Sequence, residues 1–173
     1  MKTYVPIADM KYYIGIDPGL KNGISILDQN RNIVMKCVMP IIGKASKDID
    51  KIKLIETLRL FEGRDAFCIL EKQHPRKLNG PKQAFKLGYG FACLEMLLAV
   101  FKIPYEIIAP NKWQKSILKG LNTDDTKLAS ILYCQRKYPN EDWRATERCT
   151  TNHDGLTDAT CMAEYGLNKQ IGK

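Results

Sequence analysis

Short apolar runs separated by turn residues dominate the first part of the chain. One run extends from Tyr12 to Asp17 and a second from Gly23 to Leu27, with a Pro-Gly turn between them. Residues 30–32 form the next turn, before a third run from Ile33 to Met39. Runs this short, bounded by Gly, Pro and Asn, are typical of strands joined by tight turns. The pattern predicts a three-stranded antiparallel meander.

Helical spacing of apolar residues begins after the meander. We expect residues 41–49 to form a loop, residues 52–61 a helix, and Ala66–Leu70 a fourth strand that leads directly into Glu71. A long helix is predicted from Pro81 to Phe101. Its apolar residues at helical spacing are Phe85, Tyr89, Cys93, Met96, Leu97 and Val100.

The remainder of the chain is predicted to contain one strand and three helices. The strand is Pro104–Ile108, and the helices are expected at residues 111–118, 124–137 and 154–167, the second capped near Thr123. Residues 139–151 are polar and irregular. The last helix should turn inward the side chains of Leu156, Ala159, Met162 and Ala163. This order of elements predicts an α/β fold: a mixed five-stranded sheet, meander first, flanked by helices.

Length and charge narrow the functional classes. The 173 residues suit a single domain, residues 1–173, with its core at about 12–167. Lys and Arg outnumber Asp and Glu by 27 to 19, which favours a polyanionic partner such as nucleic acid. The chain shows neither a secretory signal nor an apolar run of about 20 residues, so we expect a cytoplasmic protein with no membrane segment.

The cysteines are scattered, with no C-x-x-C pair, which predicts free and buried thiols in a reducing compartment. They are Cys37, Cys68, Cys93, Cys134, Cys149 and Cys161. Cys149 lies near His153, but zinc would need two further ligands that the neighbouring sequence does not offer. A zinc site is therefore not predicted.

A basic segment without any acidic residue follows the fourth strand. Its cationic side chains are candidates to bind DNA phosphates, and they are Lys72, His74, Arg76, Lys77, Lys82 and Lys86. Lys112, Lys115 and Lys127, at or near predicted helix starts, are further candidates. The alternative is that these are solubilising surface residues.

Four carboxylates occupy the ends of predicted elements. Asp17 closes the first strand, Glu71 closes the fourth, and Asp154 and Asp158 open the final helix. Hard carboxylate ligands from different elements are what a two-metal centre for phosphodiester hydrolysis requires. Each carboxylate also has a simpler interpretation: a turn residue, an ion pair with the following basic residues, a helix cap and a solvated helix residue, respectively.

Six short motifs occur in order between Tyr12 and Gly166. They are IGIDPG (Ile14–Gly19) followed by Gly23, ILEK (Ile69–Lys72), GYGF (Gly88–Phe91) with Leu94 and Glu95, IPY (Ile103–Tyr105), PNKW (Pro110–Trp113) and HDGLTDA (His153–Ala159). Together they resemble the RuvC-type Holliday-junction resolvases, and the match is most similar to the phage, bacterial and chloroplast branch.

The resemblance implies an RNase H-like fold, a homodimer, two Mg²⁺ or Mn²⁺ ions per active site and paired nicks across a four-way DNA junction. Asp17, Glu71, Asp154 and Asp158 match the metal-binding acidic positions. Typical bacterial members space the last two ligands three apart, whereas here they are four apart, as in the chloroplast-like branch, and His153 is an alternative ligand. The protein would then be a Mg²⁺-dependent crossover junction endonuclease of DNA recombination and repair in a bacterial or phage-infected cell.

Two other functions stay open at this point. A junction-binding protein without turnover would keep the fold, and it would bind branched DNA without cutting it in Mg²⁺ or Mn²⁺. An actin-like-fold phosphotransferase shares a G-x-D-x-G hairpin, but the chain has no second glycine-rich phosphate hairpin. Specific ATP binding would support the phosphotransferase.

Overall fold

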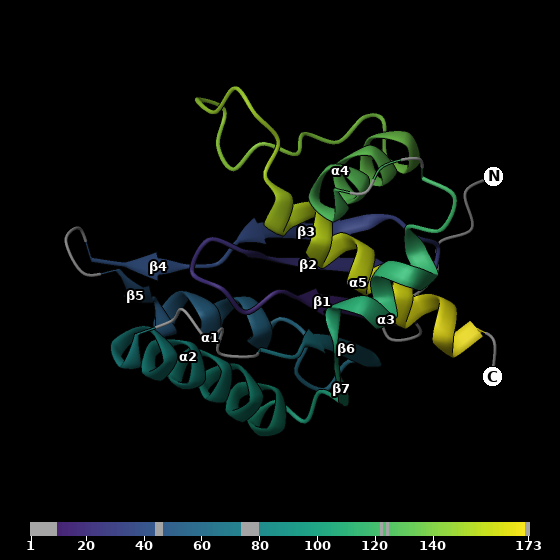
Figure 1. The fold of residues 1–173 in the computed structure, drawn as a ribbon. Coiled ribbons are helices and arrows are strands. Elements are labelled where there is room, and N and C mark those ends of the chain that lie inside the picture. Colours follow the sequence, from purple (N-terminus) through teal and green to yellow (C-terminus); the bar gives the residue numbers. More distant parts are fainter. Residues whose placement is uncertain (1–9, 44–46, 74–79, 122, 124, 172–173) are drawn as a thin grey trace.

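A mixed five-stranded sheet lies at the centre of the protein (Figure 1). The computed structural model describes residues 10–43, 47–73, 80–121, 123 and 125–171. Its elements are β1 (Tyr12–Ile16), β2 (Gly23–Asp28), β3 (Ile33–Val38), β4 (Ile41–Ile42), β5 (Asp48–Ile49), α1 (Lys51–Arg59), β6 (Ala66–Glu71), α2 (Pro81–Val100), β7 (Tyr105–Ile108), α3 (Pro110–Ile117), α4 (Thr126–Lys137) and α5 (Asp154–Ile171).

The strand order in the sheet is β3-β2-β1-β6-β7. The first three strands pair antiparallel, which confirms the predicted meander, and β6 and β7 continue the sheet in parallel with β1. Every residue of β1 and β2 is buried. The central strands are therefore covered on both faces, as their continuous apolar sequence requires.

Two layers of helices cover this sheet. Figure 1 shows α1 and α2 on one face and α3, α4 and α5 on the other. The side chains of β1 alternate accordingly: Tyr12, Ile14 and Ile16 pack with residues of α1 and α2, whereas Tyr13 packs with residues of α5. Asp17, next in the alternation after Tyr13 and Gly15, belongs on the α5 side.

Several predicted boundaries are wrong. The expected loop at 41–49 contains a small hairpin, in which Ile41 pairs with Ile49, because strands of two residues are too short to leave an alternating pattern. Helix α4 is capped by Asp125 rather than near Thr123. Helix α5 continues to Ile171, while the four side chains predicted to face inward are all buried.

The face of α2 that packs on the sheet also differs from the prediction. Leu94, Leu97 and Leu98 are buried, whereas four of the apolar residues at the predicted spacing are exposed. Their exposed fractions are 74% for Phe85, 40% for Tyr89, 60% for Met96 and 60% for Val100. The helix has apolar side chains on two faces, so spacing alone could not show which one faces the core. Its length and composition also suffice for a membrane span, which is weak evidence from a single helix.

The prediction that the thiols are free is confirmed, whereas the prediction that they are buried is confirmed for three of the six. All six cysteines are unpaired, and Cys68, Cys134 and Cys161 are buried as expected. The other three, Cys37, Cys93 and Cys149, are only half-buried.

Helix α5 lies unusually close to β1 and to the turn between β1 and β2. A Cβ atom added to Gly15 would come within 1.9 Å of the Ala159 carbonyl oxygen, and one added to Gly155 within 2.5 Å of the Asn22 Cα atom. Since backbone cannot yield as a flexible side chain can, glycine is required at both positions. The contact fixes the N-terminus of α5 at the end of β1.

We predict that Gly15→Ala lowers the free energy of unfolding by about 3 kcal/mol, because the added methyl group forces α5 away from the sheet. Urea denaturation measures the change. Gly88→Ala is the matched control: a Cβ at that position of α2 meets nothing within 4 Å, so its stability should stay within about 1 kcal/mol of wild type. Equal effects of the two substitutions would contradict this account of the packing.

Candidate metal centre

Three carboxylates from distant parts of the chain lie at the same end of the sheet. In the parallel pairing of β1 with β6, Ile16 is opposite Leu70, so Asp17 and Glu71 lie side by side where the two strands end. The N-terminus of α5, held there by its contact with the β1–β2 turn, adds Asp158. The structure thus brings together residues that the sequence predicted as ligands.

Burial and mutual repulsion shift the pKa values of these carboxyl groups upward. Asp17 is only 5% exposed, and its pKa is raised well above the ordinary range by burial first, and then by the charges of Glu71 and Asp158. Burial likewise raises the pKa of Asp158 to about 7, although the polar hydroxyl of nearby Ser130 acts in the opposite direction. The charge contributions to the shifts of Asp17 and Asp158 indicate that these groups interact in a medium that screens charge poorly.

Two neighbouring side chains orient the carboxylates. The Asn22 amide donates a hydrogen bond to Asp17 Oδ1. The Trp113 indole Nε1 donates to Glu71 Oε1 over 2.9 Å. Burial raises the pKa of Glu71, and this hydrogen bond offsets only part of the increase. Sequence reasoning missed both roles. The role of Trp113 follows from its complete burial in the structure, since a buried indole needs an acceptor for its N–H.

The donor set fits a hard cation. Asp158 Oδ1 is buried and has no hydrogen-bond partner, and a buried carboxylate oxygen without a partner is costly unless a cation contacts it. Within the described part of the chain, however, no three His, Cys, Asp or Glu side chains are close enough together to enclose a metal ion. Because like charges at this end of the sheet repel one another, bound cations would be needed to draw the carboxylates inward.

Asp154 stands at the edge of the cluster. It is the first residue of α5 rather than its cap, since the His153 carbonyl accepts the Leu156 N–H. Burial alone would raise the pKa of Asp154, but the ion pair with Lys127, 2.5 Å between Nζ and Oδ2, outweighs it and leaves the pKa lowered. His153 Nδ1 is buried without a partner. Geometry therefore keeps both Asp154 and His153 as candidate ligands.

The candidate DNA-binding residues are placed only in part. Lys72 and Lys82 are exposed, and the Lys86 ammonium donates to the Lys47 carbonyl over 3.2 Å. His74, Arg76 and Lys77 lie outside the described residues. Lys127 reaches the acidic cluster itself through Asp154, which makes it the candidate cation closest to the carboxylates among those described.

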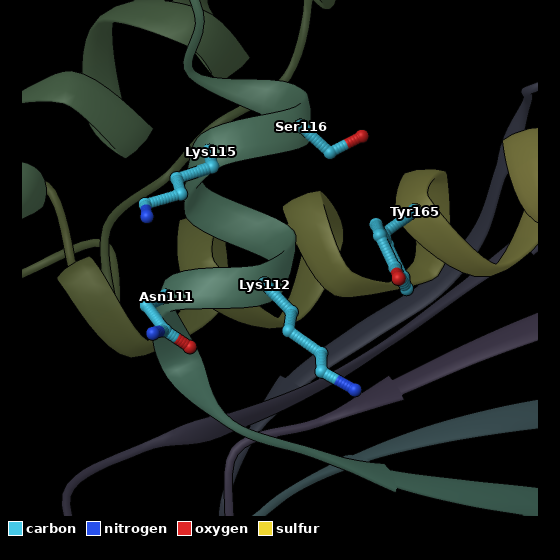
Figure 2. A pocket seen from close by; sticks show the side chains of 5 residues that line it. All are labelled: Asn111, Lys112, Lys115, Ser116 and Tyr165. Atoms are coloured by element: carbon cyan, nitrogen blue, oxygen red, sulfur yellow. The ribbon is translucent and has the colours of Figure 1, made fainter.

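Lys112 and Lys115 lie elsewhere on the surface, at an open pocket between α3 and α5. Figure 2 shows the two ammonium groups pointing to different sides of α3, with Tyr165 of α5 nearby. The lysines do not converge on one point. They resemble solvated surface residues more than a built phosphate site.

Comparison with known proteins identifies the fold. No protein-family model and no curated protein matches the sequence. Among solved structures, RuvC of T. thermophilus in complex with a Holliday junction substrate matches with a TM-score of 0.56 and 13% identity, over 94% of this chain and 96% of the other. A second Thermus thermophilus RuvC structure matches with a TM-score of 0.54 and 14% identity, again over 94% of this chain and 96% of the other. The yeast mitochondrial Holliday junction resolvase Ydc2 matches with a TM-score of 0.59 and 13% identity, over 98% of this chain and 82% of the other.

The sheet order and its helical layers define an RNase H-like α/β fold, which confirms the predicted fold class. More specifically, the fold is that of the RuvC-type Holliday-junction resolvases, as the resemblance in the sequence implied.

The raised pKa of Asp158 predicts a stability that depends on pH. Between the ordinary value of 3.8 and about 7, the Asp158 carboxyl binds more protons in the folded protein than in the unfolded chain, so without divalent cations its contribution to the free energy of unfolding should fall as pH rises through this range. Asp158→Asn should reduce the fall and, at pH 8, exceed wild type by about 1 kcal/mol. Urea denaturation across pH measures both.

Asp142→Asn is the matched control, because Asp142 is an exposed carboxylate that pairs with Arg144 at 2.8 Å. Its removal should not stabilise the protein at pH 8. An Asp158→Asn variant with the same pH profile as wild type would show that this carboxylate carries no repulsive charge in the folded state.

Proposed function

We propose that the protein is a structure-selective endonuclease that resolves four-way DNA junctions by paired, divalent-metal-dependent phosphodiester hydrolysis. The observation that carries the proposal is the convergence of Asp17, Glu71 and Asp158 at the end of the central strands, in a fold shared with a RuvC structure in complex with a Holliday junction substrate. The low sequence identity makes the chemistry of this site, rather than the likeness, the main support.

The roles of the residues follow from their positions. Two Mg²⁺ or Mn²⁺ ions would supply an activated water and stabilise the leaving oxygen. Asp17, Glu71 and Asp158 would hold them, and the hydrogen bonds from Asn22 and Trp113 keep two of these carboxylates in a fixed orientation. The protein therefore contributes position and charge and needs no side-chain nucleophile.

Lys127 has a second task in this proposal. In the structure its ammonium pairs with Asp154. If Asp154 held a metal ion instead, the Lys127 ammonium, whose side chain is 70% exposed, would be available to a DNA phosphate near the same place. Lys72, Lys82 and Lys86 would bind other phosphates of the junction, and the sequence adds His74, Arg76 and Lys77 as further candidates.

We predict that Asp17→Asn and Glu71→Gln each reduce junction cleavage by a factor of about 100 or more while junction binding is retained, because each removes a metal ligand and leaves the basic surface intact. Asp154→Asn should have the same effect, and His153→Ala only a modest one. The measurements are nicking of a labelled four-way junction, with a matched linear duplex, in Mg²⁺ and Mn²⁺, and gel-shift binding.

Asp142→Asn, at an exposed carboxylate outside the cluster, should cut like wild type. If His153→Ala is inactive and Asp154→Asn active, His153 replaces Asp154 as the ligand. Binding of the junction by the wild-type protein without any cut in either metal would instead support a junction-binding protein without turnover.

The exposed apolar face of α2 supports a homodimer. A four-way junction presents two symmetry-related strands, and an isologous dimer would place one active site on each. Phe85 and Tyr89 stack with their ring centroids 6.4 Å apart on this face, and Met96 and Val100 extend it along the helix. Leu97, another of the apolar residues at helical spacing, is buried in the protomer and does not belong to this face.

We predict that Met96→Glu converts a dimer into a monomer at micromolar concentration, because it places a charge in the apolar interface. Light scattering after gel filtration measures the mass, and a cruciform plasmid reports paired cuts as linear product and single cuts as nicked circles. Val34→Glu, on the exposed side of edge strand β3, is the control and should stay dimeric. A wild-type monomer that still makes paired cuts would exclude the dimer.

A further inference from the structure

A pocket of about 400 Å³ opens at the same end of the sheet as the carboxylates. Its walls come from the β1–β2 turn (residues 18–22), from Ile49 of the small hairpin, and from one side of α2 (residues 83–90). This volume lies in the range of small-molecule sites, roughly 300–1,000 Å³. Asn22 and Lys86 have roles in the proposed function, but no ligand has been assigned above to the pocket itself.

The pocket adjoins the acidic cluster directly. Pro18, which follows Asp17 in the chain, lines it, and so does Asn22, whose amide donates to Asp17 Oδ1. A DNA phosphate bound near Asp17 would therefore place one of its neighbouring nucleotides close to the pocket. Lys21 and Lys86 also line the pocket, and their positive charges suit the sugar–phosphate backbone at its mouth.

The chemistry of the walls suits a flat aromatic ring with a polar edge. Leu20, Ile49 and Leu87 supply apolar surface, and Gly90 leaves the space open, since a Cβ there would lie 3.0 Å from Ile49 Cδ1. Gln83 adds an exposed amide with both donor and acceptor capacity. Apolar walls with a few polar groups are the usual environment of a bound, unstacked base.

We propose that this pocket binds one unstacked base of the strand that is cut, adjacent to the scissile phosphate, and that Gln83 reads its edge. The proposal rests on the proposed nuclease function and adds a source of sequence preference to it. Bases at a branch point are easier to unstack than bases within a duplex. A glutamine amide makes two hydrogen bonds with adenine, so adenine is the base expected to be preferred.

The test places 2-aminopurine, whose fluorescence rises when it unstacks, at single positions within two nucleotides of the cut in otherwise identical junctions. Binding is measured in Ca²⁺, and cleavage preference is measured in Mg²⁺ on junctions with each base at the same positions. Leu87→Trp fills the pocket and Gln83→Ala removes the amide. Val34→Trp, on β3 and outside the pocket, is the matched control, and thermal unfolding reports whether each variant is folded.

We expect Leu87→Trp to abolish the fluorescence rise at one position only, and Gln83→Ala to reduce base discrimination there by about tenfold, with Val34→Trp unchanged. If Leu87→Trp is unfolded, the exposed Gln83→Ala substitution decides alone. If the wild-type protein cuts junctions and neither variant changes the fluorescence rise or the base preference, the base-binding role of the pocket is wrong and the proposed nuclease function is unaffected. A wild-type protein that neither binds nor cuts any junction would overturn both proposals.

Discussion

The close contact between α5 and β1 is the constraint on which the rest of the structure depends. With glycine at 15 and 155, the helix backbone approaches the strand backbone more closely than any side chain would permit. This brings Asp158 from the last helix to the ends of β1 and β6. Buried hydroxyl contacts, such as Thr160 to Ser25 at 2.8 Å, hold the helix in register along the sheet. A small shift of α5 would keep the hydrophobic core but separate the carboxylates.

That contact has an electrostatic cost. Asp17, Glu71 and Asp158 are forced together where water screens them poorly, so each resists ionisation. A neutral residue at each of these positions would be more favourable for folding, so the three acidic residues lower the stability of the protein. Natural proteins break such rules chiefly at functional sites. The conflict between burial and charge is therefore itself an argument for function, independent of any likeness to other proteins.

The sequence was most informative where strand and helix ends coincide with acidic residues. Runs of buried β-residues predicted the meander and β6, and the parallel ends of β1 and β6 then follow from the order of elements. The sequence could not predict specific side-chain contacts. Trp113 and Glu71 are 42 residues apart, and the short distance between Asn22 and Asp17 in the sequence does not show which way the Asn22 amide points. The sequence did not predict the β4–β5 hairpin for a different reason: strands of two residues are too short to show a periodic pattern.

Helix α2 shows how an ambiguous sequence pattern can itself indicate function. A helix that serves only the core has one apolar face, yet α2 buries Leu94 and Leu98 and leaves Phe85 and Met96 exposed. At about 100° per residue, Leu87 and Phe85 point about 200° apart, so the pocket beside the carboxylates and the exposed apolar face lie on nearly opposite sides of the helix. A partner subunit seated on the exposed face would leave the pocket open to DNA. If both proposals hold, this one helix would support the sheet, contact a second subunit and border the nucleotide next to the cut.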